Sequence, residues 1–369
     1  MAAVFFYISG HGFGHASRQI EIINALGALP SIEIVICTSA ARWLFTRTLR
    51  APFTFVEGPV DTGVVQVDAL RLDEAATIAR AAEFHHHLPE RAHREAARLL
   101  ERGARLVVAD APPLGCAAAS AAGVPSVVVS NFTWDWIYEG YAEHLSGAPD
   151  LIATLRDAYR RAEAGWRLPM HGGFAPFSTV IDVPLVARHA RHDPATVRAR
   201  LGLPSHGPLV LSSFGGYGLE NVDYVRLDCL GRYGVVVTGG DGGNDSAPGI
   251  HRLDDSSLYD AGLRYEDLVA AVDVVVTKPG YGIIAECVAN QTAMLYTSRG
   301  RFAEYDVLVA EMPRMLRCEF LSIDDLLAGR WLAALDRLLA LPAPPERPST
   351  NGAQVVADMI RHHLEQEHI

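Results

Sequence analysis

Residues 9–18 read Ser-Gly-His-Gly-Phe-Gly-His-Ala-Ser-Arg. They follow an apolar run from Ala2 to Ile8 and precede a segment, Gln19 to Leu29, with the apolar spacing of a helix. A strand that turns through glycines into a helix places backbone N–H groups at the carboxyl edge of a sheet. Open α/β proteins bind their ligands at this edge. The stretch therefore predicts an α/β fold with a binding site at the loop, which also carries His11 and His15.

The loop differs from the dinucleotide-binding fingerprint G-x-G-x-x-G. His15 stands where the third glycine belongs, and no acidic residue closes the second expected strand, Ile32 to Cys37. An acidic side chain at that strand end would be needed to bind the ribose of such a cofactor. We therefore expect neither a nicotinamide nor a flavin cofactor, and predict that the protein uses none.

Composition narrows the class of protein further. A chain of 369 residues predicts two domains of about 150 to 200 residues each. The net charge of -11, with no dense run of Lys and Arg, argues against nucleic acid as a partner. Five scattered cysteines without C-x-x-C spacing are typical of a reducing compartment, so we expect a cytoplasmic protein.

Two segments that resemble membrane signals are interpreted otherwise. Leu106 to Val129 carries a single charge, but prolines and glycines divide it into strand, helix and strand. The amino terminus lacks a basic region ahead of its apolar run. We expect neither an integral membrane segment nor a signal peptide.

Short apolar runs alternate with helical patterns in two series, which is typical of parallel sheets. A long helix is expected over Ala148 to Trp166, between the two series. We predict an amino-terminal Rossmann-like domain over 1–187 and a carboxyl-terminal one over 188–349. A final helix within 350–369 should pack back on the first domain. The expected strands are Val4–Ile8, Ile32–Cys37, Leu106–Ala109 and Ser126–Val129, then Leu209–Ser213, Val235–Thr238, Val272–Thr277 and Ala293–Tyr296.

The second series ends two of its strands in glycine-rich turns. One turn reads Ser213-Phe214-Gly215-Gly216, and the other Lys278-Pro279-Gly280-Tyr281-Gly282. Glycines and a helix start let a phosphate approach backbone N–H groups. Glu286 lies one helical turn beyond Gly282, about 6 Å along the axis. We predict a nucleotide diphosphate on these turns, facing Gly12 and Gly14, with its ribose on Glu286 and its base near Tyr265.

A second group of residues predicts acid–base chemistry in the first half. Asp110 ends the strand at 106–109, so it should share the carboxyl edge with His15 and orient its imidazole as a general base. His11 competes for this role, and a purely structural His15–Asp110 pair that braces the loop is the alternative.

Aromatic residues after the next strand could wall an acceptor pocket. Asn131, Trp134 and Trp136 are the candidates, together with His11 of the glycine loop, and ordinary core packing is the alternative for the aromatic residues. His85, His86, His87 and His93 suggest zinc, but consecutive residues on a helix point in different directions, and no metal site is expected.

Five stretches resemble the glycosyltransferase-like domain of plant L-arabinokinases and its free-standing bacterial relatives, which belong to the wider group of GT-B glycosyltransferases. They span much of the chain, from about residue 4 to residue 335. The stretches are Tyr7–Arg18, Asp61–Leu70, Ser130–Tyr138, Val180–Val186 and Lys278–Glu286.

This resemblance implies a GT-B fold with His15 as catalytic base and Asp110 as its partner. It implies that residues 213–216 and 278–282 hold the donor diphosphate and that Glu286 binds the ribose. The donor-sugar position, often Asp-Gln, falls near Glu304-Tyr305, which departs from the pattern, as does Lys278 in place of a common histidine. Nothing after Trp331 offers an ATP-binding loop, so kinase activity is not expected.

The predicted function is transfer of a sugar from a nucleotide-diphosphate sugar, expected to be UDP-linked, to a hydroxyl acceptor. The reaction should be independent of metal and invert the anomeric centre. Two alternatives stay open. One is a nucleotide-sugar epimerase of the same fold, and the other is a module that binds a nucleotide sugar without turnover.

Overall fold

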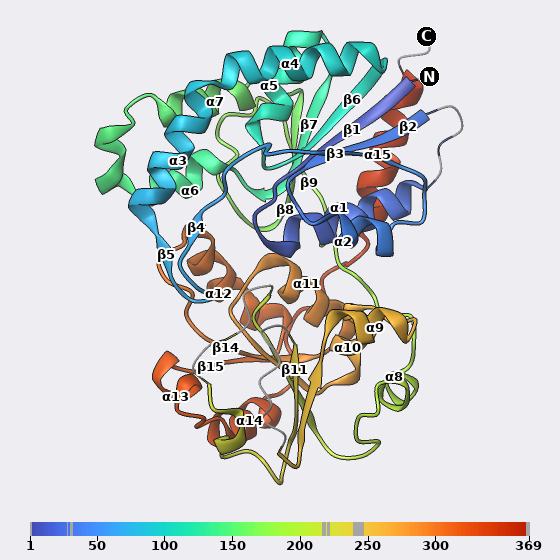
Figure 1. Cartoon of the computed structure of the whole chain (residues 1–369), viewed down its shortest axis with the longest axis vertical. Coiled ribbons are helices and arrows are strands. Elements are labelled where there is room, and N and C mark those ends of the chain that lie inside the picture. The colour runs from blue at the N-terminus through green and yellow to red at the C-terminus, as the bar shows by residue number, and fades with distance from the viewer. Residues whose placement is uncertain are drawn as a thin grey trace.

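The computed structural model describes residues 2–27, 29, 32–215, 219, 222–238 and 247–366 of the chain. Its strands form two parallel sheets and a short antiparallel hairpin, with helices on both faces of each sheet (Figure 1). We call the half built on the seven-stranded sheet the amino-terminal lobe, and the half built on the six-stranded sheet the carboxyl-terminal lobe. The predicted α/β class with two parallel sheets is confirmed.

Apolar strands build the sheet of the amino-terminal lobe. Its order is β3 (Thr54–Glu57), β2 (Ile32–Thr38), β1 (Ala2–Ile8), β6 (Ala104–Asp110), β7 (Ser126–Phe132), β8 (Ala164–Gly172) and β9 (Val180–Asp182). Alternate side chains of a strand face opposite sides of a sheet. Accordingly, Phe6 and Phe5 of β1 pack in different apolar clusters. The helices beside Phe6 are α1 (Gly12–Leu26), α2 (Arg42–Thr48) and α15 (Gly352–Gln366), and those beside Phe5 are α3 (Glu74–His86), α4 (Leu88–Glu101), α5 (Pro113–Ala122), α6 (Trp134–Glu139) and α7 (Leu151–Tyr159).

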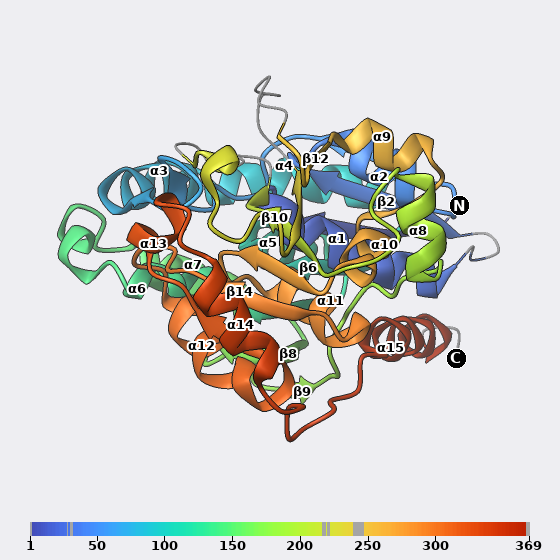
Figure 2. The ribbon, with the colours of Figure 1, turned by 90° about the horizontal axis from the view of Figure 1, so that it is seen from below.

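The carboxyl-terminal lobe repeats this arrangement with six strands. Their order is β12 (Ile250–Leu253), β11 (Gly234–Thr238), β10 (Leu209–Ser213), β13 (Val274–Thr277), β14 (Ala293–Tyr296) and β15 (Cys318–Phe320). One face carries α8 (Pro194–Arg200), α9 (Asp255–Asp260), α10 (Tyr265–Ala271), α11 (Tyr281–Asn290) and α12 (Ala303–Met315). The other carries α13 (Ile323–Leu327) and α14 (Leu332–Ala340), as Figure 2 shows.

Strand order reverses at one point in each sheet, and this positions the site. In the first sheet β1 lies between β2 and β6, and in the second β10 lies between β11 and β13. Successive crossovers leave such a strand pair in opposite directions, which opens a crevice at the carboxyl ends of the strands. The two crevices therefore lie at the loops that follow β1, β6, β10 and β13.

The chain crosses between the lobes at residues 183–193, which link β9 to α8, and two further contacts help to hold the lobes together. The hairpin of β4 (Val65–Gln66) and β5 (Leu72–Asp73) extends from the amino-terminal lobe toward α12 (Figure 1). Helix α15 packs along α1, and Arg361 donates to the carbonyls of Ala25 and Leu26 at the end of α1. None of the described helices has the length and apolar character that crossing a membrane requires.

The eight predicted strands are all present, but the long helix expected over Ala148 to Trp166 is wrong. Helix α7 ends at Tyr159, and Ala164 already begins β8, which pairs with β7. Gly165 lies in this strand and packs closely, since a Cβ atom there would lie 2.8 Å from the Phe174 ring. The apolar pattern of the segment does not by itself distinguish a buried strand from the buried face of a helix.

Candidate active site

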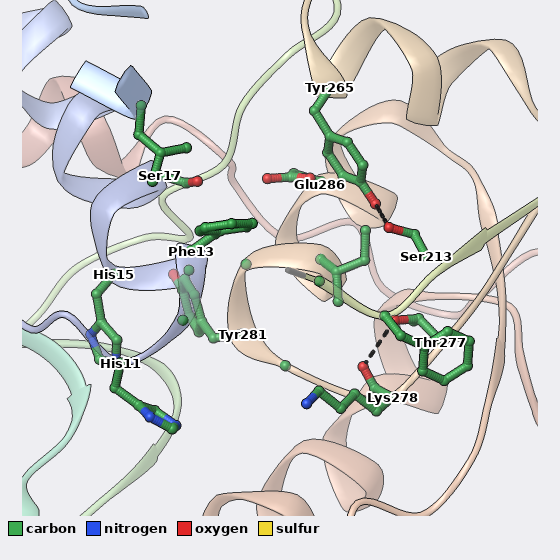
Figure 3. A pocket seen from close by; sticks show the side chains of 18 of the residues that line it. His11, Phe13, His15, Ser17, Ser213, Tyr265, Thr277, Lys278, Tyr281 and Glu286 are labelled. Carbon is green, nitrogen blue, oxygen red and sulfur yellow. Dashed lines mark hydrogen bonds between the residues drawn. The ribbon is translucent and has the colours of Figure 1, made fainter. Parts of the chain in front are cut away.

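A cavity of about 940 Å³ lies between the two lobes. It is lined by the start of α1 from one side and the start of α11 from the other, and Gly14 and Gly282 approach closely where these helices meet. The first N–H groups of a helix have no partner within the helix and carry partial positive charge. Figure 3 shows His11 and His15 on one side of the cavity, with Lys278 and Ser213 on the other.

His15 and Asp110 form a buried pair at the crevice between β1 and β6. His15 Nδ1 lies 2.7 Å from Asp110 Oδ1. Burial raises the pKa of Asp110, but the charges of Arg18 and His15 outweigh it and lower the pKa to about 2. The carboxylate is therefore ionised and orients the imidazole. With Nδ1 protonated toward Asp110, Nε2 is the ring nitrogen that can accept a proton.

Arg18 is the third member of this cluster. It lies three residues after His15, on the same face of α1, and its Nε donates to Asp110 Oδ2 at 2.6 Å. Its Nη1 donates to the side chain of Asn131 at 2.6 Å, and its Nη2 lies 2.9 Å from His15 Nδ1. The guanidinium therefore fixes the carboxylate, which in turn orients the imidazole.

His11 also lines the cavity, but its environment differs from that of His15. Burial lowers its pKa well below the usual value, and the charges of His15, Arg299 and Lys278 lower it further. Its ring lies against Trp134 and Phe302. His11 is thus a neutral side chain, and in the described part of the chain no carboxylate pairs with it.

The glycine-rich turns of the carboxyl-terminal lobe follow β10 and β13 and line the cavity. Lys278 Nζ donates to the carbonyl of Ala69 at 2.6 Å, and burial with the charge of Arg299 lowers its pKa to about 8. Ser213 Oγ accepts from the Tyr265 hydroxyl at 2.9 Å. The cavity is also lined by Phe214, Gly215, Pro279, Gly280, Tyr281 and Gly282, and Gly216 lies outside the described residues.

Glu286 lines the cavity but is not free of the protein. Arg188 donates to its Oε1 through both Nε and Nη2. Glu286 Oε2 is buried and accepts no hydrogen bond from the described residues. Burial raises its pKa to about 7, since the nearby charge of Glu266 offsets part of the effect of Arg188. The Glu286 carboxylate is thus held by Arg188 through one oxygen only.

The residues expected at the acceptor and the donor sugar divide into two groups. Asn131 and Glu304 both line the cavity, and Asn131 Nδ2 donates to Glu304 Oε1 at 2.8 Å across the lobes. Trp134 is fully buried and donates to Asp61, whereas Trp136 packs against the backbone of Gly172. Neither tryptophan is among the residues that line the cavity.

Comparisons with known proteins agree on the architecture. No family model matches the chain. The chain is 30% identical over 366 residues to L-arabinokinase from Arabidopsis thaliana, and the match covers 96% of this chain and 34% of that protein. It thus spans about a third of the length of this relative.

Solved structures resemble nearly the whole chain. The glycosyltransferase of kitacinnamycin matches with a TM-score of 0.66 at 16% identity, covering 98% of each chain. The calicheamicin glycosyltransferase CalG4 gives 0.61 at 15%, again covering 98% of each. A UDP-glucosyltransferase from Polygonum tinctorium gives 0.57 at 14%, covering 98% of this chain and 93% of its own. The chain has the GT-B fold.

Three arginines of this GT-B cavity were missed by the sequence interpretation, namely Arg18, Arg188 and Arg299. Arg18 alone had a signal, since it stands on the helix face of His15. Arg188 comes from the segment that crosses between the lobes. Arg299 follows β14 and donates to the carbonyl of Pro279 and to Glu304. Nothing in the local sequence around Arg188 or Arg299 indicates the partners of these two side chains.

The histidines considered for zinc do not converge. Nδ1 of His85 contacts the carbonyl of Ala81, and that of His93 contacts the carbonyl of Pro89, so both rings are bonded to their own helix turns. One other group could offer three ligand atoms within the described residues, Glu74, Glu143 and His144, but Arg301 pairs with both carboxylates.

Proposed function

We propose that the protein transfers a sugar from a nucleotide-diphosphate sugar, UDP-linked, to a hydroxyl group of an acceptor. The observation that carries this proposal is the opposition of two groups across one cavity. The His15–Asp110 pair faces it from one lobe, while Lys278 and the start of α11 face it from the other. A base and an anion-binding helix end on opposite sides of one cavity suit attack on a carbon that loses a diphosphate.

In the proposed reaction, His15 Nε2 takes the proton of the acceptor hydroxyl. The acceptor oxygen then bonds to the anomeric carbon as the bond from that carbon to the diphosphate oxygen breaks, which inverts the centre. Negative charge grows on the departing diphosphate. Lys278 and the N–H groups of α11 stabilise that charge, so the step is proposed to need no metal.

The other residues take their roles from their place along the cavity. We assign the ribose to Glu286 Oε2, the base to the region of Tyr265, and the transferred sugar to the region of Glu304. The acceptor lies near His11 and Asn131. In domain terms, residues 1–187 with the helix in 350–369 would bind the acceptor, and residues 188–349 the donor.

Names of the similar proteins support a nucleotide-linked donor. One of them is described as a UDP-glucosyltransferase, and the glycosyltransferase VinC, which matches with a TM-score of 0.56 at 15% identity, is described in complex with dTDP. A thermal-shift screen against UDP-, GDP- and dTDP-sugars will show which donor the cavity prefers. Incubation with that donor alone tests epimerisation, which would release an altered sugar without any acceptor.

The decisive experiment is His15→Ala, assayed with the donor found in that screen and a panel of hydroxyl acceptors. Removal of a general base should lower kcat by about 10² to 10⁴, while the donor Kd stays near that of the wild type. His93→Ala on α4, outside the cavity, is the control. Unchanged kcat in His15→Ala would reject the assignment, and a comparable loss in His11→Ala alone would move the base to that residue.

A further inference from the structure

A second cavity, of about 540 Å³, lies beside the first where the two lobes meet. Arg47 lines it from α2, Arg191 from the segment that crosses between the lobes, and Arg264 from the residue before α10. Figure 1 shows α2 directly above α9, at the edge of the contact between the lobes. Tyr259 lines both cavities, so they are neighbours separated by this side chain.

These arginines lack carboxylate partners. Within the described ranges, none of the three forms an ion pair. Arg47 lies over the ring of Tyr259 with its guanidinium carbon 5.3 Å from the ring centre, and Arg264 Nη2 donates to the carbonyl of Thr48 at 3.2 Å. In a chain with a net charge of -11, three unpaired guanidinium groups around one cavity are a local excess of positive charge.

Of the two acidic side chains that line this cavity, Asp260 and Asp267, the second already has hydrogen-bond partners. Asp267 Oδ1 accepts from the backbone N–H groups of Arg191 and His192, and Oδ2 accepts from the backbone N–H of Arg264. Its charge therefore fixes the backbone of the crossing segment and caps α10. It forms no direct ion pair with a guanidinium group in the described part of the chain.

Like charges repel one another around Arg264. Burial lowers its pKa, and the charges of Arg191 and Arg50 lower it further, while Glu266 and Glu21 act in the opposite direction. His192, Arg200 and Asp260 complete the charged groups at this place. A bound anion would relieve the repulsion between the arginines.

We propose that this second cavity binds a phosphate-bearing small molecule, separately from the donor in the first cavity. Guanidinium groups present paired N–H donors that match phosphate oxygens, and several of them together suit a dianion better than a single carboxylate. The cavity, of about 540 Å³, leaves room beside one phosphate group for the rest of a larger molecule. Because its arginines come from both lobes and the crossing segment, the ligand holds the lobes together and stabilises the folded chain.

The test is titration of the whole chain with pyrophosphate and, in parallel, with inorganic phosphate, followed by calorimetry and by Tm. The wild type should bind pyrophosphate with a saturable rise in Tm. The double variant R47Q/R191Q removes two exposed side chains that lie outside the first cavity. It should raise the pyrophosphate Kd by about tenfold or more, the effect of losing one or two charge-assisted hydrogen bonds. The matched control R80Q/R94Q changes the charge equally on α3 and α4 and should leave the Kd unchanged.

A third variant, K278M, separates the two cavities without relying on the proposed reaction. Because pyrophosphate also suits the proposed donor site, the titrations are compared in the K278M background. Binding that is retained in K278M and lost when R47Q/R191Q is added to K278M would place the site in the second cavity. Binding that is already lost in K278M, and retained in R47Q/R191Q, would place the phosphate in the first cavity and overturn the proposal. Equal losses in R47Q/R191Q and R80Q/R94Q would overturn it too, since they would show an effect of net charge alone. Succinate binding as tightly as pyrophosphate would overturn the assigned class of ligand.

Discussion

At the scale of single residues, Glu286 and Lys278 are two ionisable groups on the carboxyl-terminal side of the cavity. Donor binding requires the first to be deprotonated and the second to be protonated. Glu286 must be ionised to accept ribose hydroxyls most strongly, and its pKa is raised to about 7. Lys278 must be protonated to attract a diphosphate, and its pKa is lowered to about 8. Only between these values do both groups carry the charge that the proposed donor requires.

Donor affinity should therefore depend on pH with a maximum between pH 7 and 8. Below it, protonation of Glu286 should weaken binding, and above it, loss of the Lys278 proton should do so, each by up to about tenfold per pH unit. Calorimetric Kd values for UDP-glucose across this range provide the measurement, because its phosphodiester oxygens stay ionised throughout. Glu286→Gln should remove the acidic limb and Lys278→Met the alkaline limb. Variant profiles with the wild-type shape would contradict both assignments.

The positions of single site residues could be predicted from the sequence only where a strand end or a helix start determines them. His15 and Lys278 follow strands, Asp110 ends one, and Glu286 stands one turn into a helix, so their shared edge followed from topology. Arg188 and Arg299 reach their partners through long flexible side chains, whose direction depends on neighbours distant in sequence. No local pattern encodes this reach.

At the scale of elements, the start of α1 combines two glycines with different functions. Gly12 has a φ of +70°, a conformation that side chains rarely adopt, whereas Gly14 is helical and has nothing within 4 Å of where a Cβ would stand. Because Gly14 lines the cavity, that open space belongs to the site proposed for substrates. The helix itself gives no reason for a glycine there.

Gly14→Ala should therefore make the protein more stable and less active. The methyl group should raise the unfolding free energy by about 0.5 to 1 kcal/mol through helix propensity, and Tm should rise with it. It would also occupy substrate space, so kcat/KM should fall. Gly12→Ala is the contrasting variant, because left-handed strain of about 1 to 2 kcal/mol should lower its Tm. A Gly14→Ala enzyme with wild-type kcat/KM would show that substrates do not use this space.

Strands could be predicted from the sequence where their residues are buried along the whole strand. The eight predicted strands are apolar runs at the centres of the sheets. The edge strands β3, β9, β12 and β15 and the hairpin β4–β5 are not predicted from the sequence, because they are short and partly or fully exposed. Their positions depend on the neighbour that each one pairs with rather than on an apolar pattern of their own.

At the scale of the whole molecule, the hairpin β4–β5 ties the lobes to each other. Ala69 and Leu70 belong to the amino-terminal lobe by sequence but are buried in the apolar cluster of the carboxyl-terminal lobe. The carbonyl of Ala69 accepts from Lys278, and that of Leu70 lies against Gly300. We call this contact of Ala69 and Leu70 with the carboxyl-terminal lobe the clasp. It gives a structural role to the stretch from Asp61 to Leu70, which carries the family resemblance but provides no proposed catalytic group. The sequence predicted two lobes with facing edges but not the clasp, because the contact depends on how the lobes are oriented.

Leu70→Ala tests whether the clasp supports both folding and donor binding. Loss of a buried leucine side chain should reduce the unfolding free energy by about 2 to 5 kcal/mol, measured by chemical denaturation. If the anchored hairpin holds Lys278 in place, the donor Kd should also rise by about three- to tenfold, the effect of one hydrogen bond. Val67→Ala on the same hairpin is the matched control, because Val67 is 57% exposed and should change neither quantity. Loss of stability with an unchanged donor Kd would leave the clasp a purely structural contact, and Lys278 would then be positioned by its own lobe.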